Sequence, residues 1–257
     1  MKVKFIYLLA AIFVLSASFQ GCDKNPKDDN KENPTGGGNG NGTETPIEED
    51  DGVSRPTLVV SVNGDISVEN FVTGTVGTVT FSRFPATIKE FKQVREQIGE
   101  TMMGCVALQV MAGELYRRNV SSGTECMKLN NISNQNARYL NLLKEALRAR
   151  PYQFAAYLEG ASWDNGYNPA KPYTIEFHVT PTSAKSYSND YQTDIYNFFI
   201  KSNGHETNGG LQPVQVMKTK KPGEPGENGK YYIIFASSSI YLQCKTKSFE
   251  YDFNGLD

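Results

Sequence analysis

The sequence predicts an α+β fold, in which about four helices pack on a largely antiparallel sheet after a disordered tether. Three observations predict this class. Two segments rich in β-branched residues come first in the folded part, helical periodicity follows, and strand-like alternation fills the rest of the chain. Separate runs of helices and strands are typical of α+β domains, whereas α/β domains alternate the two. We therefore expect the helices to cover one face of the sheet.

Residues 1–21 have the pattern of a bacterial lipoprotein signal peptide. Two lysines precede an apolar stretch over residues 5–17, which suits a signal-peptide core and is short for a membrane span. Gly21 stands directly before Cys22, although the two residues before Gly21 depart from the usual pattern. We expect Cys22 to carry the lipid that anchors the protein to a membrane. The alternative is an ordinary cleaved signal peptide with a chance cysteine.

Residues 22–55 are predicted to be a flexible tether. They lack aromatic residues and contain a run of glycine and asparagine, so they cannot bury enough apolar surface to offset the entropy of ordering. Residues 23–55 hold nine acids and four bases, a net charge of −5. The acids close to Cys22 resemble the surface-export signals of Bacteroidetes-type lipoproteins. We therefore expect a place in the cell envelope, at the outer membrane, facing either the periplasm or the exterior.

Residues 56–257 are predicted to form a single domain, because their length is enough for one substantial core. This part holds 20 bases and 19 acids. Such a balanced charge argues against a nucleic-acid partner, which would require a basic surface.

Three cysteines remain in the domain: Cys105, Cys126 and Cys244. Their number is odd and their spacing matches no metal motif, so the sequence does not say whether any disulfide forms. Cys105 lies in an apolar helix and is expected to be a buried hydrophobic residue. If a pair forms, we favour Cys126 with Cys244.

The first elements are two strands and an amphipathic helix. Residues 57–62 and 75–84 are rich in β-branched side chains. Thr87 is followed three residues later by Glu90, which is the spacing of a capping box at a helix start. Apolar residues then recur at helical intervals up to Ile98, so one face of this helix should pack on the core.

Residues 101–119 are apolar nearly all round, which predicts a helix inside the core. Methionines at this spacing are more often packing residues than metal ligands. A polar link is expected over residues 121–136, followed by a third helix over 137–150. Residues 151–160 predict a short fourth helix that Gly160 ends.

The remaining segments have the pattern of strands. Residues 173–179 alternate apolar and polar side chains, and similar patterns follow along the chain. Residues 221–229, rich in glycine and proline, are expected to be a loop. The other predicted strands are 193–202, 213–220, 230–244 and 248–253.

Few side chains have the pattern of a catalytic or metal site. The two histidines, His178 and His205, lack zinc-ligand spacing to another histidine or cysteine. The sequence contains no phosphate loop, nucleophile elbow or dinucleotide fingerprint. We therefore predict no catalytic residue, no metal and no cofactor, and the absence of motifs favours a protein that is not an enzyme. A glycosidase would need two carboxylates across a cleft, for which the candidates are Glu114, Glu159, Asp164 and Glu176.

The corner between the helical and the strand region is the best candidate for a binding site. Residues 160–173 read GASWDNGYNPAKPY and include the only tryptophan of the chain. Aromatic rings with polar neighbours are typical of sugar and peptide sites. We predict Trp163, Asp164 and Tyr167 as ligand-binding residues. The alternative is that the corner is only a turn, with its rings folded beneath it to seal the core.

The segments ALQVMAGELYRRN and PYQFAAYLEGASWDNGYNPAKPYTIEF resemble a family of secreted and lipoprotein domains from gut-type bacteria, known only as a domain of unknown function. The resemblance spans the chain from about residue 84 to its end. It implies an extracytoplasmic location and a shared fold. It assigns no catalytic residue.

Three functions follow as hypotheses. The first is a non-catalytic, membrane-tethered module of the envelope that binds a glycan, a peptide or an envelope protein. The second is an envelope hydrolase of glycan or peptide bonds that uses Asp164 and Glu176, or a carboxylate with His178. The third is a structural or assembly lipoprotein that recognises another protein through a sheet edge or a helical face. The anchor, the tether and the lack of catalytic motifs favour the first.

Overall fold

The computed structural model describes residues 51–131, 136–204, 210–218, 229–234, 240 and 244, which all lie in one compact unit. The predicted signal peptide, Cys22 and the tether up to residue 50 lie outside these residues. So do His205 and the predicted strand 248–253. Within the described part of the chain, no helix is long and apolar enough to cross a membrane.

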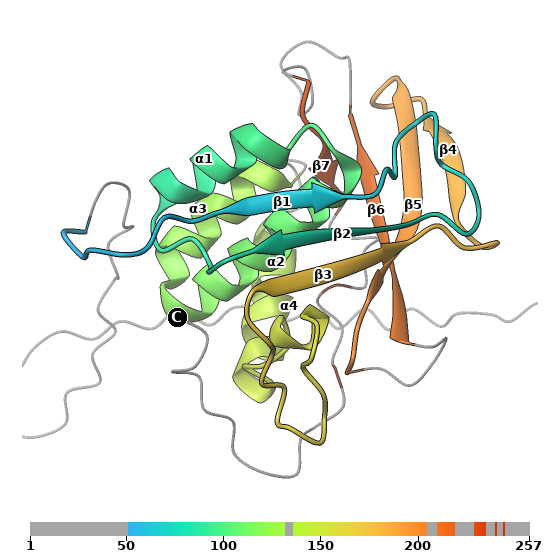
Figure 1. Cartoon of the computed structure of the whole chain (residues 1–257). Helices are drawn as coiled ribbons and strands as arrows, with labels where there is room; N and C mark the ends of the chain where they lie inside the picture. Colours follow the sequence, from blue (N-terminus) through green and yellow to red (C-terminus); the bar gives the residue numbers. More distant parts are fainter. Residues whose placement is uncertain are drawn as a thin grey trace, which may run out of the picture. The chain divides into compact units, whose positions relative to one another are not determined.

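The described strands form one antiparallel sheet, which confirms the β part of the prediction (Figure 1). Its order is β1-β2-β3-β5-β6-β7, and β4 pairs with β5 beside this path. Tyr173, Ile175 and Phe177 are buried as the alternation predicts. The strands are β1 Val60–Asn63, β2 Val76–Phe81, β3 Tyr173–His178, β4 Ala184–Ser188, β5 Thr193–Lys201, β6 Leu211–Met217 and β7 Tyr232–Ile233.

Helices pack against this sheet, and the fold is α+β as predicted. In Figure 1 the helices lie behind β1, β2 and β3. Helix α2 is buried from Met102 to Tyr116 and contacts β2, β6 and β7, so it is the central core helix. The described helices are α1 Ile88–Ile98, α2 Met102–Arg118, α3 Val120–Asn130 and α4 Asn136–Ala149.

The predicted polar link over residues 121–136 is wrong, because α3 occupies most of it. Asn119 ends α2 and also starts α3, since its side chain accepts a hydrogen bond from the Ser122 N–H at 2.8 Å. Gly123 lets the two helices approach closely, because a Cβ there would lie 2.1 Å from the Cα of Tyr116. This packing, which is not visible in the hydrophobic pattern, makes the segment helical.

Two further details differ from the prediction. The expected helix over residues 151–160 is only a 3₁₀ turn, Ala155–Tyr157. Strand β4 was not predicted, because its residues are mostly exposed and show no buried alternation.

The suggested disulfide between Cys126 and Cys244 is not formed. Both are buried free thiols, as is Cys105. Cys126 belongs to α3, whereas the main-chain N–H of Cys244 donates to the side chain of Gln153. Burial raises the pKa of the Cys126 thiol to about 12 and that of the Cys244 thiol to about 11.

Candidate functional site

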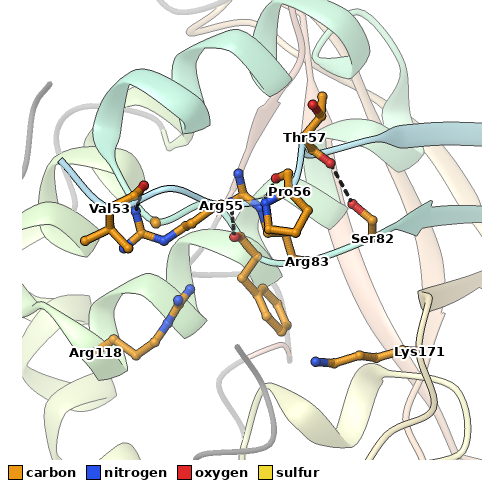
Figure 2. A pocket seen from close by; sticks show the side chains of 10 residues that line it. Val53, Arg55, Pro56, Thr57, Ser82, Arg83, Arg118 and Lys171 are labelled. Carbon is orange, nitrogen blue, oxygen red and sulfur yellow. Dashed lines mark hydrogen bonds between the residues drawn. The ribbon is translucent and has the colours of Figure 1, made fainter. Parts of the chain in front are cut away.

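A pocket of about 510 Å³ opens where four parts of the chain meet (Figure 2). They are the segment before β1, the end of β2, the end of α2 and the corner before β3. Its described lining includes four bases and no acid. The bases are Arg55, Arg83, Arg118 and Lys171, and Val53, Pro56, Phe84 and Ala86 supply apolar surface.

Arg83 lines this pocket and is held in place by hydrogen bonds from all three nitrogens of its guanidinium group. Its Nε donates to the carbonyl of Pro56 at 2.8 Å, and its Nη1 donates to the carbonyl of Phe84 at 3.1 Å. Both Nη atoms also bond the carboxylate of Glu90, in one case at 2.9 Å. The hydrogen bond from Arg83 lowers the pKa of the Glu90 carboxyl. Arg83 therefore ties β2, α1 and the segment before β1 together.

Arg118 and Lys171 approach the pocket from opposite sides in Figure 2. The Arg118 guanidinium donates from Nη2 to the carbonyl of Pro85 at 3.0 Å and lies 5.7 Å from the centre of the Phe84 ring. The Lys171 ammonium lies 5.7 Å from the centre of the Tyr173 ring. The two rings are 5.0 Å apart. Each ring of the Phe84–Tyr173 pair therefore lies beside one cation, Arg118 at Phe84 and Lys171 at Tyr173.

Arg55 belongs to the segment before β1, whose residues 53–57 form what we call the outer wall of the pocket. It makes a two-pronged ion pair with Asp51, at 2.6 and 2.7 Å. The hydrogen bond from Arg55 lowers the pKa of Asp51 to about 2. The wall is joined to β2 by the bond from Arg83 to Pro56 and by a hydrogen bond from Ser82 Oγ to the carbonyl of Thr57 at 3.4 Å.

The electrostatics of this pocket suit an anion. Two of the four bases form ion pairs with acids that are not lining residues. Asp51 pairs with Arg55, and Glu90 pairs with Arg83. Charge-assisted bonds from arginine and lysine are the strongest that a protein offers to carboxylate or phosphate. No histidine, cysteine or acid is present among the described lining residues. The arrangement therefore offers an anion several charged hydrogen-bond donors at one pocket.

The predicted corner residues do not meet on one exposed surface. Tyr167 is fully buried, and its ring stacks on Tyr152. Trp163 is partly buried and packs against the core, and Asp164 is exposed. The organising residue is Asn165, whose side chain donates to the carbonyls of Gly160 and Asn168 and accepts from the N–H groups of Ser162 and Asn168.

The other acids are distributed over the domain. Glu176 and His178 contact each other at 2.5 Å on β3, and neither lines the pocket. Glu114 is fully buried in α2 and pairs with Arg117 at 3.0 Å, and burial raises the pKa of its carboxyl. Glu159 is exposed. In the described residues no group of three histidines, cysteines or acids could hold a metal ion.

Sequence reasoning missed the four pocket bases. They come from positions far apart in the chain, and no local spacing links them. The one usable signal is the position of Lys171 in the corner over residues 160–173, beside the predicted Trp163, Asp164 and Tyr167.

A family model described as "Domain of unknown function (DUF6935)" matches residues 83–248. The matched range includes Arg83, Arg118 and Lys171, whereas Arg55 and the rest of the outer wall precede it. No curated protein and no solved structure matches the chain.

Proposed function

The chain belongs to the DUF6935 family, and we propose that it is a lipid-anchored, non-catalytic binding module of the cell envelope that takes an anionic ligand. The observation that carries this proposal is the pocket of about 510 Å³ lined by four bases without a described acid. Its volume lies in the usual range of ligand sites, about 300–1,000 Å³.

The location is proposed from the N-terminal sequence. The signal-like residues 1–21 and Cys22 support a lipid anchor, and the acidic residues after Cys22 support the outer membrane. The length of residues 22–55 would let the domain reach polymers near the membrane to which the lipid holds it.

The ligand is proposed to carry carboxylate or phosphate groups. Arg118 and Lys171 lie on opposite sides of the pocket, so one ligand with two acidic groups can contact both. An acidic glycan and an acidic peptide share this chemistry. The apolar wall residues Val53 and Pro56 give space for a sugar or side-chain face between the charges.

The test is binding of the full chain to an array of acidic and neutral oligosaccharides and peptides, followed by calorimetry on each hit. We expect acidic probes alone to bind, and Arg118→Gln and Lys171→Gln each to weaken binding about tenfold. Lys185→Gln is the matched control, because Lys185 pairs with Asp194 outside the pocket. Equal binding of neutral probes, or an equal loss in the control, would contradict the proposal.

A further inference from the structure

A second pocket borders the outer wall on the side of α1. It has a volume of about 650 Å³, and Gln93 and Gln97 of α1 belong to its lining. Arg83 and the wall residues 55–57 line both this pocket and the cationic pocket of Figure 2, so the wall has a cavity on each side. We propose that the two pockets are neighbouring subsites for one linear glycan, with an acidic sugar in the cationic pocket and the next, neutral sugar in the second pocket. This inference rests on the proposed function of the cationic pocket.

The wall between the two pockets is held in place by hydrogen bonds. Arg83 Nε donates to the carbonyl of Pro56 at 2.8 Å, and the N–H of Val59 donates to Ser82 Oγ at 3.1 Å. The Arg83 guanidinium also donates to Glu90, which lines the second pocket. Because one arginine contacts both pockets and the wall, their spacing is fixed, and a ligand that spans them meets a preorganised surface.

The two pockets differ in charge. The described lining of the cationic pocket has four bases and no acid, whereas that of the second pocket has two bases, Arg55 and Arg83, and two acids, Glu90 and Glu96. An acidic group of the ligand in the second pocket would face these carboxylates, and like charges brought together oppose binding. The charges therefore favour an acidic unit in the cationic pocket and a neutral unit in the second.

The polar groups of the second pocket suit a sugar. Gln93 and Gln97 are exposed and four residues apart, so both amides lie on one face of α1, about 6 Å apart along its axis. Each amide both donates and accepts hydrogen bonds, as each sugar hydroxyl does. Pro56 and Leu58 add apolar surface against which the C–H face of a sugar ring can pack. A peptide main chain offers one N–H and one C=O per residue to these groups, so a glycan is the better match.

The test is calorimetry of the full chain with two acidic tetrasaccharides of equal length. Acidic and neutral sugars alternate in the hyaluronan tetrasaccharide, whereas every sugar of tetragalacturonate is acidic. We expect the hyaluronan tetrasaccharide to bind about fivefold more tightly, because only its neutral sugar suits the second pocket.

The two glutamines of α1 should carry this preference. Gln93→Ala and Gln97→Ala should each weaken binding of the hyaluronan tetrasaccharide about threefold and change that of tetragalacturonate less than about twofold. Both variants should fold, since the side chains are exposed and alanine favours helix. Asn189→Ala is the matched control, because Asn189 is an exposed amide between β4 and β5 that lines neither pocket.

A charge substitution should change binding in the opposite direction. Glu96 pairs with Lys230 at 2.7 Å, yet its side chain is 69% exposed and its carboxylate can face a ligand. Glu96→Gln should raise the affinity for tetragalacturonate about threefold and leave that for the hyaluronan tetrasaccharide nearly unchanged. Glu100→Gln is the control of equal charge, because Glu100 follows α1 and lines neither pocket.

The outcomes separate this inference from the proposed function. Equal affinities for the two tetrasaccharides, or no effect of Gln93→Ala and Gln97→Ala, overturn the inference, whereas a loss of binding in Arg118→Gln still supports the cationic pocket. Tetraglutamate is the peptide probe, and binding of this probe with the same dependence on Gln93 and Gln97 would show that the occupant is a peptide and not a glycan. If no acidic probe binds, the proposed function and the inference fail together.

Discussion

Tyr167 stacks on Tyr152 with ring centres 4.9 Å apart and ring planes 9° apart. Tyr167 itself has φ 62°, a conformation that side chains other than glycine rarely adopt. The stacking and the complete burial of the ring hold the backbone there. The tyrosine of the corner therefore contributes to the core, and a ligand could touch its ring only if the corner opened.

Removing this ring should destabilise the fold. Tyr167→Ala leaves a cavity beside Tyr152, and we expect a loss of about 3 kcal/mol in the free energy of unfolding, measured by denaturant titration. Trp163→Ala should cost clearly less, because Trp163 is only partly buried. A Tyr167→Ala protein that kept its stability but lost ligand binding would instead favour a direct binding role.

The strands could be predicted because burial follows their alternation. In β3, Tyr173, Ile175 and Phe177 face the core while the residues between them are half-buried. Helix α3 could not be predicted in this way, because its buried face includes the polar residues Ser122 and Asn130. Asn130 is accommodated by hydrogen bonds to α2, among them one to the carbonyl of Cys105 at 2.9 Å. Such a partner comes from another helix, and local periodicity contains no information about it.

The candidate site was less predictable than the fold for the same reason. Arg83 and Arg118 are 35 positions apart in the chain, and only the packing of α2 beside the end of β2 brings both to one pocket. The sequence drew attention to the corner through its rings. In the structure, the corner contributes Lys171 to the lining of the pocket, whereas Tyr167 is buried in the core.

The Arg83–Glu90 pair should make stability depend on pH in the acid range. The folded-state pKa of Glu90 is lowered from its ordinary value of 4.5. Its contribution is therefore present above pH 4.5 and is lost as the pH falls through the lower, folded value. We expect Glu90→Gln to lose up to about 1 kcal/mol at pH 7, since the pair is partly exposed to solvent, and to match wild type in strong acid. A constant difference between the two proteins from pH 7 to strong acid would contradict this prediction.

Glu114 should show the opposite pH dependence. Burial raises the pKa of this carboxyl, and among the described residues its Oε1 has no hydrogen-bond partner. A raised folded-state pKa means that the folded protein holds the proton longer, so stability falls as the pH rises from the unfolded value through the folded one. We expect unfolding free energies measured over this window to fall in wild type and to fall less in Glu114→Gln. A parallel decline in both proteins would show that Glu114 does not titrate in this way.

The contact between α2 and α3 depends on the missing side chain of Gly123. A Cβ at this position would lie 2.1 Å from the Cα and 2.2 Å from the N of Tyr116, and neither backbone atom can move without shifting a helix. We expect Gly123→Ala to lower the free energy of unfolding by about 2–3 kcal/mol, although alanine favours helix more than glycine does. Thr124→Ala is the matched control, because Thr124 is next to Gly123 in the same helix. Its hydroxyl donates a hydrogen bond to the carbonyl of Val120, one turn earlier in that helix. Equal stability of Gly123→Ala and Thr124→Ala in denaturant titrations would mean that the two helices are not packed this closely.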